Sequence, residues 1–498
     1  MLYIRMLLSI VVSLYTSRVV LNALGVEDFG IYNVVGGIVV LFSFLNNATT
    51  NAVQRFLNYY MGKKDNVGMY SIFNVSLSFH ILLIFIIVFL AETIGLWIVN
   101  YCLNIPAEKY AAANVVYQFT IVTFCLSLLK APYNALIIAF EKMSFFAYMS
   151  VGEVLLKLIV AFLLLQSPFS RLEFYAVLLC FVSLMILIFY YVYCKKLFPS
   201  FSFYFVRDKS KYGELLSFSV WSLFGGITNI VVNQGGNILL NIFGGVVANT
   251  SLGIANQVGA AVYGFISNFQ MAFNPQIVKL YSSGNSIDFY NLLFRATKIS
   301  YYLMLVLSIP VLFKIEYVLS LWLGQLPLYS VEFCRLIILY CLIDALSGPL
   351  WMSVQANGNI KLYQVLMCIV LILNFPISYI LLKAGLSPVW LLLVRLLLNV
   401  ISYFVRLAYL KFRIDFPLNN YIREVFFRIF VVSLVSIIVS YMLFNYVFNR
   451  DAILEFVLGG LLWCLLFSII CFILGFNSVE KKYIEYAFAK LKNKICNE

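Results

Sequence analysis

Charged residues are scarce in this sequence. Asp, Glu, Lys and Arg make up 11% of its 498 residues, against about 25% in an average soluble domain. Hydrophobic residues make up 63% of the chain. A soluble protein of this size has no core large enough to hide that much apolar surface. The composition therefore excludes an ordinary soluble fold.

The residues that usually carry enzyme chemistry are also sparse. His80 is the one histidine of the chain, and the ten cysteines include no CxxC pair. A Walker A motif is missing as well, which excludes ATP as the direct energy source. We therefore predict a protein that is not an enzyme and holds no metal or cofactor. Its energy source would be a proton or sodium gradient.

Long apolar runs are abundant instead, and they recur near the length of a membrane-spanning helix along the whole chain. The run at 81–99, ILLIFIIVFLAETIGLWIV, is too long and continuous for a strand of a membrane β-barrel. The sequence thus predicts an all-α polytopic membrane protein. Fourteen spans are expected, at 2–24, 29–53, 71–99, 112–138, 145–166, 172–194, 213–240, 251–276, 298–323, 333–355, 361–382, 386–410, 424–447 and 454–475.

The positions of the basic residues give an independent test of this number of spans. With an even number, both termini lie on one side of the membrane, and most of the lysines and arginines fall in loops of that side. The opposite loops hold only Lys109, Arg171, Lys314, Lys383 and Arg450. Because positive charge is retained in cytoplasmic loops, both termini are predicted to be cytoplasmic.

The chain is predicted to form two lobes of six spans each. The first covers 1–195, a basic cytoplasmic linker follows at 196–212, and the second covers 213–411. Residues 412–498 would form the last two spans and a basic tail.

An internal repeat supports this division. GIYNVVGGIVVLF at 30–42 shares its glycine and asparagine pattern with GIANQVGAAVYGF at 253–265. An offset of six spans keeps the orientation, so the halves would be parallel repeats, as in transporters with a substrate site between two halves. The alternative is a chance likeness between two apolar segments.

The start of the chain resembles a known family. The pattern Arg18, Leu24-Gly25, Phe29-Gly30 and Tyr32, followed by the polar segment NNATTNAVQRF at 46–56, is similar to polysaccharide flippases of the Wzx type. These belong to the multidrug/oligosaccharidyl-lipid/polysaccharide (MOP) exporter superfamily. The resemblance implies a V-shaped, MATE-like architecture. It also implies outward movement of an undecaprenyl-pyrophosphate-linked repeat unit of O-antigen (the glycan of lipopolysaccharide), capsule or exopolysaccharide, across the bacterial inner membrane.

Four basic residues stand deep within the predicted spans: Arg18, Lys130, Lys157 and Arg395. Placing a charge at the bilayer centre costs at least about 2.5 kcal/mol, so each should face a wet cavity or a partner. Glu153 lies four residues before Lys157, which favours an ion pair. Arg395 either pairs with Asp344 or faces the cavity.

We expect Arg18 and Lys130 to line a cationic cavity, with snorkelling or an ion pair between lobes as alternatives. Arg55, at the polar end of the second span, joins the candidates. Guanidinium and ammonium groups bind phosphate oxygens through charge-assisted hydrogen bonds, which suits a pyrophosphate or an acidic sugar.

The seventh span carries asparagines four residues apart, on one face of a helix: Asn229, Asn233, Asn237 and Asn241. Their amides either line the cavity and bind sugar hydroxyls, or bond to neighbouring helices. His80, in the third span, is expected to be a polar residue that faces the helix bundle, and proton coupling is its alternative role.

Two other functions remain open. A cation-coupled exporter of small molecules would need an acid in span one or seven, where only Glu214 stands, near the start of span seven. A membrane partner of a polysaccharide synthesis complex would transport nothing. The expected partners are the lipid-linked oligosaccharide, the bilayer, a polysaccharide polymerase and glycosyltransferases, and no nucleic acid.

Overall fold

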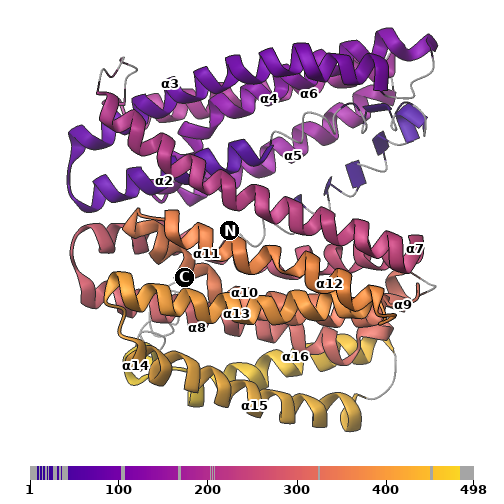
Figure 1. The fold of residues 1–498 in the computed structure, drawn as a ribbon, viewed down its shortest axis with the longest axis vertical. Coiled ribbons are helices and arrows are strands. Elements are labelled where there is room, and N and C mark those ends of the chain that lie inside the picture. The colour runs from indigo at the N-terminus through magenta and orange to yellow at the C-terminus, as the bar shows by residue number, and fades with distance from the viewer. Residues whose placement is uncertain are drawn as a thin grey trace, which may run out of the picture. The chain divides into compact units, whose positions relative to one another are not determined.

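The computed structural model of this protein describes most of the chain after residue 42. The described residues are 8–9, 12–13, 15–16, 19–20, 22–25, 28, 31–32, 35, 43–102, 107–165, 170–201, 204, 206, 208–323, 326–448 and 452–482. Within them every regular element is a helix (Figure 1). The hydrocarbon core of a bilayer offers no hydrogen-bond partners, so each helix there satisfies its own backbone N–H and C=O groups.

Between residues 43 and 197 the described part of the chain forms five α-helices, which Figure 1 shows in indigo and violet. They are α2 (Ser43–Gly62), α3 (Asn66–Leu90), α4 (Tyr110–Ala139), α5 (Met143–Leu165) and α6 (Arg171–Leu197). α3 begins after Asp65, whose carboxylate accepts a 2.8 Å hydrogen bond from the Gly68 N–H. It continues through two π-helical turns, η1 (Ala91–Gly95) and η2 (Ile98–Cys102). A short 3-10 turn, η3 (Ala107–Lys109), leads into α4, which packs against α2 and α6.

Helix α7 (Lys209–Ser282) is far longer than the others and is interrupted once. Gly245 has φ of 68° and ψ of −169°, a conformation that a residue with a Cβ rarely adopts. The two parts match the spans expected at 213–240 and 251–276, and each exceeds the about 20 residues that a span needs. The structure differs from the prediction in the connection: helix continues on both sides of one glycine where a ten-residue gap was expected.

The second half begins with α8 (Ser286–Phe313), α9 (Ile315–Leu323) and α10 (Ser330–Asn357). It continues with α11 (Lys361–Ile372), α12 (Asn374–Lys383) and α13 (Val389–Ile414). α10 packs between α8 and α13. Of the most apolar stretch of α10, 61% is buried, against 22% for α16 at the end of the chain. α10 is therefore the central helix of this half.

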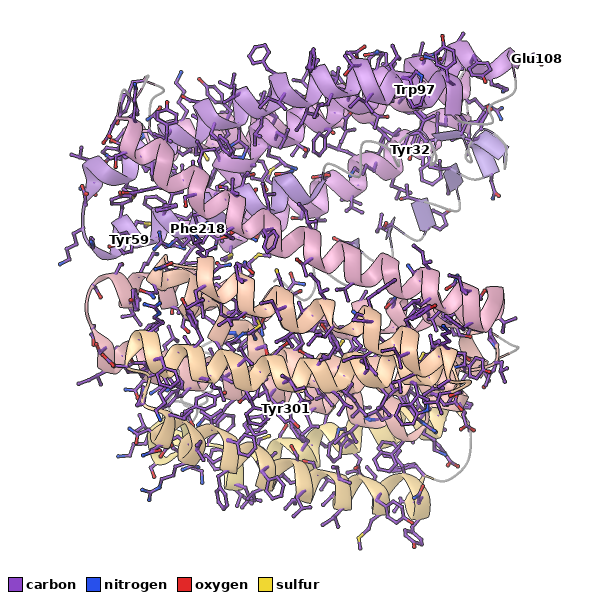
Figure 2. The ribbon with its side chains drawn as sticks, in the orientation of Figure 1. Tyr32, Tyr59, Trp97, Glu108, Phe218 and Tyr301 are labelled. Atoms are coloured by element: carbon purple, nitrogen blue, oxygen red, sulfur yellow. The ribbon has the colours of Figure 1, made fainter. Side chains whose placement is uncertain are left out.

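The last helices lie beside α8 in Figure 1. They are α14 (Leu418–Tyr421), η4 (Ile422–Phe426), α15 (Phe427–Met442), η5 (Leu443–Val447), α16 (Ile453–Ile470) and η6 (Cys471–Gly475). The hydroxyls of Tyr301 on α8 and Ser433 on α15 are 2.9 Å apart, and Figure 2 shows Tyr301 among these helices. The Trp463 indole donates to the Val306 carbonyl at 3.0 Å. These bonds attach α15 and α16 to α8.

The chain divides into two compact units. Unit 1 contains residues 1–227, 278–285 and 358–361, and unit 2 contains 228–277, 286–357 and 362–498. α7 contributes to both. The lobe boundaries that the sequence suggests stay a prediction, because these units are defined by contacts alone. The repeat also stays a prediction, since most of its first copy, 30–42, lies outside the described residues.

The predicted fold class is confirmed: this is an all-α polytopic membrane protein. Ten helical segments of the described chain are long and apolar enough to cross a membrane, and they coincide with the third to sixth and ninth to fourteenth expected spans. For example, α4 covers the span expected at 112–138. About half of the residues in the first two expected spans, 2–24 and 29–53, lie outside the described residues, and α2 covers the end of the second.

Candidate functional site

A cavity in unit 2 forms where α7 approaches α12 and α13. A Cβ added to Gly235 would lie 3.0 Å from the Phe375 ring, and one added to Gly236 would lie 3.6 Å from a methyl of Leu391. The glycine pair thus lets the α7 backbone come close to both helices. The next residue, Asn237, then lies at the wall of the cavity.

The cavity has a volume of about 410 Å³ and gathers polar side chains from three helices. Asn237 and Asn256 come from α7, Asn374 from α12 and Arg395 from α13. The rest of the lining is Val232, Gly236, Leu252 and Leu391. A guanidinium beside carboxamides offers several N–H donors and a few carbonyl acceptors, which suits an oxygen-rich anion or glycan.

Arg395 is held in place by an aromatic ring. Its Cζ lies 4.7 Å from the centroid of Tyr340 on α10, a cation–π arrangement. No ion pair within 4 Å joins Arg395 to Asp344 in the described part of the chain, although the sequence left that pairing open. The Asp344 carboxylate instead interacts with the Tyr263 hydroxyl on α7.

A second arginine acts on Asp344 from further along α13. The positive charges of Arg406 and Arg395 both stabilise the carboxylate of Asp344. The Nε of Arg406 donates a 2.6 Å hydrogen bond to the Tyr363 hydroxyl on α11. Asp344, two arginines and three tyrosines thus form a half-buried polar network next to the cavity in unit 2.

Unit 1 contains the other intramembrane charges that the sequence indicated. Lys157 and Glu153, four residues apart on α5, lie 2.8 Å apart between Nζ and Oε1. Lys130 on α4 reaches Oε2 of the same carboxylate at 3.4 Å. Its Nζ also lies 5.7 Å from the ring of Tyr190 on α6. The structure therefore gives Lys130 an acidic partner on a neighbouring helix.

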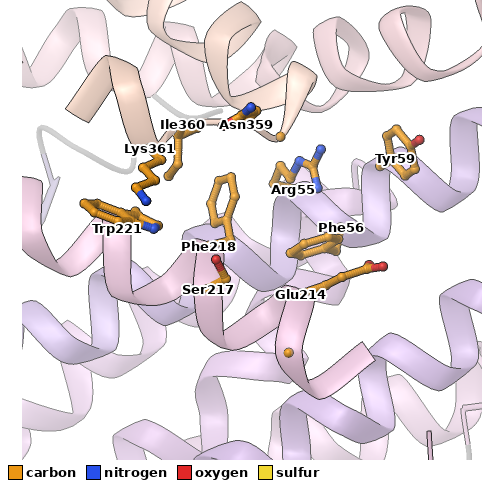
Figure 3. A pocket seen from close by; sticks show the side chains of 12 residues that line it. Arg55, Phe56, Tyr59, Glu214, Ser217, Phe218, Trp221, Asn359, Ile360 and Lys361 are labelled. Atoms are coloured by element: carbon orange, nitrogen blue, oxygen red, sulfur yellow. The ribbon is translucent and has the colours of Figure 1, made fainter. Parts of the chain in front are cut away.

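Arg55 lines a different pocket, of about 590 Å³, within unit 1. Figure 3 shows Arg55, Phe56 and Tyr59 from α2 facing Phe218 and Trp221 from α7. The guanidinium carbon is 4.5, 5.0 and 5.4 Å from the rings of Phe56, Tyr59 and Phe218. Only 6% of Arg55 is exposed. The rings rather than water surround this cation.

His80 is buried between α2 and α3. Its Nε2 lies 3.1 Å from the Thr49 hydroxyl and its Nδ1 lies 2.8 Å from the Ser76 carbonyl. It thus faces the bundle, at the place where the sequence expected a polar residue.

Some candidates fall outside what the structure describes. Arg18 is one of them. Asn229, Asn233 and Asn241 lie on the described backbone of α7, but their side chains do not belong to the described part. Their roles stay predictions, as does the role of every other candidate residue named from the sequence.

The sequence missed the network around Asp344. Arg406 stands near the end of the span expected at 386–410, where a basic residue is common, and Tyr263 carries no signal among 34 tyrosines. A helical projection of 389–414 offers one clue: Arg395, Asn399, Ser402 and Arg406 recur at spacings of three and four, which places polar residues on one face of α13.

Comparison with known families identifies the chain. The model of a family described as polysaccharide biosynthesis protein matches residues 1–281, more than half of the sequence. The chain belongs to this family, within the MOP superfamily. Sequence comparison with curated proteins yields no match.

Solved structures agree with this family on the fold. An outward-facing MATE multidrug transporter of the MOP superfamily superposes with a TM-score of 0.68 at 14% identity, covering 83% of this chain and 94% of that one. The same values hold for a MOP transporter from Pyrococcus furiosus. That transporter is described as having a binding pocket of reverse polarity, which suggests a different function. MATE bound to MaL6 gives 0.69 at 13% identity, covering 83% and 95%. This polysaccharide biosynthesis protein therefore has the fold of MATE transporters.

Proposed function

We propose that this protein moves a lipid-linked oligosaccharide from the cytoplasmic to the outer leaflet of a bacterial inner membrane. The carrier lipid would be undecaprenyl pyrophosphate, and the glycan would be a repeat unit of O-antigen, capsule or exopolysaccharide. Membership of a polysaccharide biosynthesis family and the fold of a transporter both support an exporter of this kind.

The observation that carries the proposal is Arg395 in the cavity of unit 2. A fixed cation inside a membrane-spanning helix is costly unless a ligand or water uses it. Here it stands next to three asparagines, so the cavity presents charge for a pyrophosphate or acidic sugar and amides for hydroxyls. An exporter of cationic drugs would place an acid there instead.

The energy source in this proposal is a proton or sodium gradient, and the movement is an alternating exposure of the cavity to the two sides of the membrane. Both termini would be cytoplasmic. A polysaccharide polymerase and glycosyltransferases would act on the same glycan before and after it crosses.

Reconstitution tests the proposal directly. Purified protein in liposomes should move a fluorescent undecaprenyl-pyrophosphate oligosaccharide to the opposite leaflet when an ion gradient is applied. Arg395→Gln should slow this movement about tenfold or more, since a charge-assisted hydrogen bond contributes about 1.5–3 kcal/mol. Arg395→Lys, which keeps the charge, should recover part of the rate.

Arg413→Gln is the matched control, because Arg413 is an exposed arginine on the same helix, outside the cavity. Its rate should equal that of the unaltered protein. Unaltered transport by Arg395→Gln would contradict the role of the cavity. If the unaltered protein moved an organic cation and no glycolipid, the small-molecule exporter would be the correct function.

A further inference from the structure

Unit 2 contains a second polar pocket, which shares no lining residue with the cavity described above. It has a volume of about 370 Å³ and lies where α8, α14 with η4, and the segment after Asn477 meet. Its polar lining is Asn291, Arg295, Lys298, Asn420, Arg423, Glu424, Asn477 and Glu480. The distribution of basic loops predicts that this end of unit 2 faces the cytoplasm.

One wall of the pocket is built on a buried ion pair. Lys298 Nζ and Glu480 Oε2 lie 2.7 Å apart, and their side chains are 1% and 7% exposed. Glu480 Oε2 also accepts a 2.8 Å hydrogen bond from the Asn477 N–H, while Asn477 Oδ1 accepts one of 2.8 Å from the Glu480 N–H. This reciprocal capping box orders residues 477–480, and the ion pair with Lys298 attaches them to α8.

The charges around the pocket are not balanced. Glu480 pairs with Lys298 and lies 3.9 Å from the Nε of Arg295. The Oε2 of Glu424 lies 3.7 Å from the Nε of Arg428 on the next turn. Arg423 is exposed, and among the described residues no ion pair or hydrogen bond involves it. The pocket therefore presents one uncompensated guanidinium.

Apolar side chains surround this guanidinium on the outside of the helices. Ile422, Phe426 and Phe427 are 48%, 43% and 62% exposed, and Val479 at the pocket itself is 53% exposed. Exposed apolar side chains on a membrane-spanning helix face acyl chains. A ligand of this pocket thus has an anionic end and lies against an apolar surface.

We propose that the pocket binds the phosphate headgroup of an anionic phospholipid from the cytoplasmic leaflet. Arg423 donates two parallel hydrogen bonds to the phosphate oxygens, and the amides of Asn291 and Asn420 donate to the glycerol and ester oxygens. Basic pockets between helices on the cytoplasmic side bind such headgroups in other membrane proteins. This site lies outside the cavity and goes beyond the proposed transport.

Thermal unfolding of the full-length protein in a neutral detergent tests this site. Titration with phosphatidylglycerol should raise the unfolding midpoint, because a ligand that binds only the folded state stabilises it. Phosphatidylcholine at the same concentration should raise it far less. Millimolar inorganic phosphate should leave it unchanged, which separates a lipid headgroup from a free anion.

Arg423→Gln should weaken the apparent affinity for phosphatidylglycerol about tenfold or more, and Arg413→Gln, a matched exposed arginine, should leave it unaltered. The unliganded midpoint of both variants should equal that of the parent, since neither side chain is buried. Native mass spectrometry should show a retained phosphatidylglycerol in the parent and not in Arg423→Gln. Equal shifts with phosphatidylcholine or with phosphate, or full binding by Arg423→Gln, would overturn the proposal.

Discussion

Units 1 and 2 each hold a cluster of two basic side chains and one acid within membrane-spanning helices, but they arrange these charges differently. In unit 1, Lys130 and Lys157 both contact Glu153 directly. In unit 2 each member of the cluster has a tyrosine beside it: Tyr263 interacts with Asp344, Tyr340 lies beside Arg395 and Tyr363 accepts a hydrogen bond from Arg406. Among the described residues, no ion pair within 4 Å joins this acid to either base.

This difference indicates two uses of buried charge. In a direct ion pair each charge is neutralised by its partner and is not available to a ligand. The cluster of unit 1 therefore serves to hold α4 against α5. In unit 2 Arg395 has no direct ion pair with Asp344, so its guanidinium is available at the wall of a cavity. Two basic residues and one acid thus have a structural role in unit 1, whereas in unit 2 they leave a cation suited to binding a ligand.

Removal of the acid in unit 2 should have the largest effect on stability. Asp344→Ala leaves two buried guanidiniums without their counter-charge and Tyr263 without its acceptor, which costs about 3 kcal/mol of unfolding free energy. Asp344→Asn keeps an acceptor for Tyr263 and should lose about half as much. Equilibrium unfolding in detergent micelles measures both. A loss in Asp344→Ala no larger than in Asp344→Asn would show that the acid acts through its charge alone and that the contact with Tyr263 contributes nothing.

Removal of the acid in unit 1 should cost less. The side chains of Lys130 and Lys157 are 26% and 43% exposed, so after Glu153→Gln their ammonium groups can turn toward water. We expect a loss of about 1–2 kcal/mol in the same unfolding measurement. Glu316→Gln is the control, because Glu316 pairs with Arg335 at the surface and should cost less than about 0.5 kcal/mol. Equal losses of unfolding free energy in Glu153→Gln and Glu316→Gln would contradict a structural role for the unit 1 cluster.

The tyrosine that bonds to Asp344 should have the smallest effect of the three. Tyr263→Phe removes one hydroxyl and keeps the ring, so it should cost about 1 kcal/mol. Combined with Asp344→Ala it should add almost nothing, because both changes remove the same bond. Full additivity in this double-mutant cycle would mean that Tyr263 and Asp344 act independently.

Apolar runs were sufficient to predict the helices, since a bilayer forces any long apolar segment to satisfy its own backbone. The spacing of Glu153 and Lys157 was likewise sufficient for their pair, because four residues make one turn. The contact of Lys130 with Glu153 depends on the register of α4 against α5, and no local pattern encodes that register. For the same reason the sequence pointed to Arg395 and Asp344 but not to the tyrosines that contact them.

The connection at Gly245 was missed for a different reason. The pair Gly244-Gly245 lies in the gap expected between the spans at 213–240 and 251–276, whereas the positive φ of Gly245 redirects the helix in a single residue. A connection of one residue leaves no polar stretch in the sequence. Composition could therefore only suggest a loop of ordinary length between the two spans.

The ion pair between Lys298 and Glu480 also affects how the protein is made. The two residues are 182 positions apart in the chain, and a ribosome needs roughly 10–40 s to add that many residues. During this time α8 has entered the membrane with an ammonium group that still lacks its counter-charge. The contacts of Tyr301 with Ser433 on α15 and of Val306 with Trp463 on α16 form late as well. The α8 helix therefore reaches its final environment only when the last helices have been synthesised, which makes biogenesis of unit 2 sensitive to changes near residue 480.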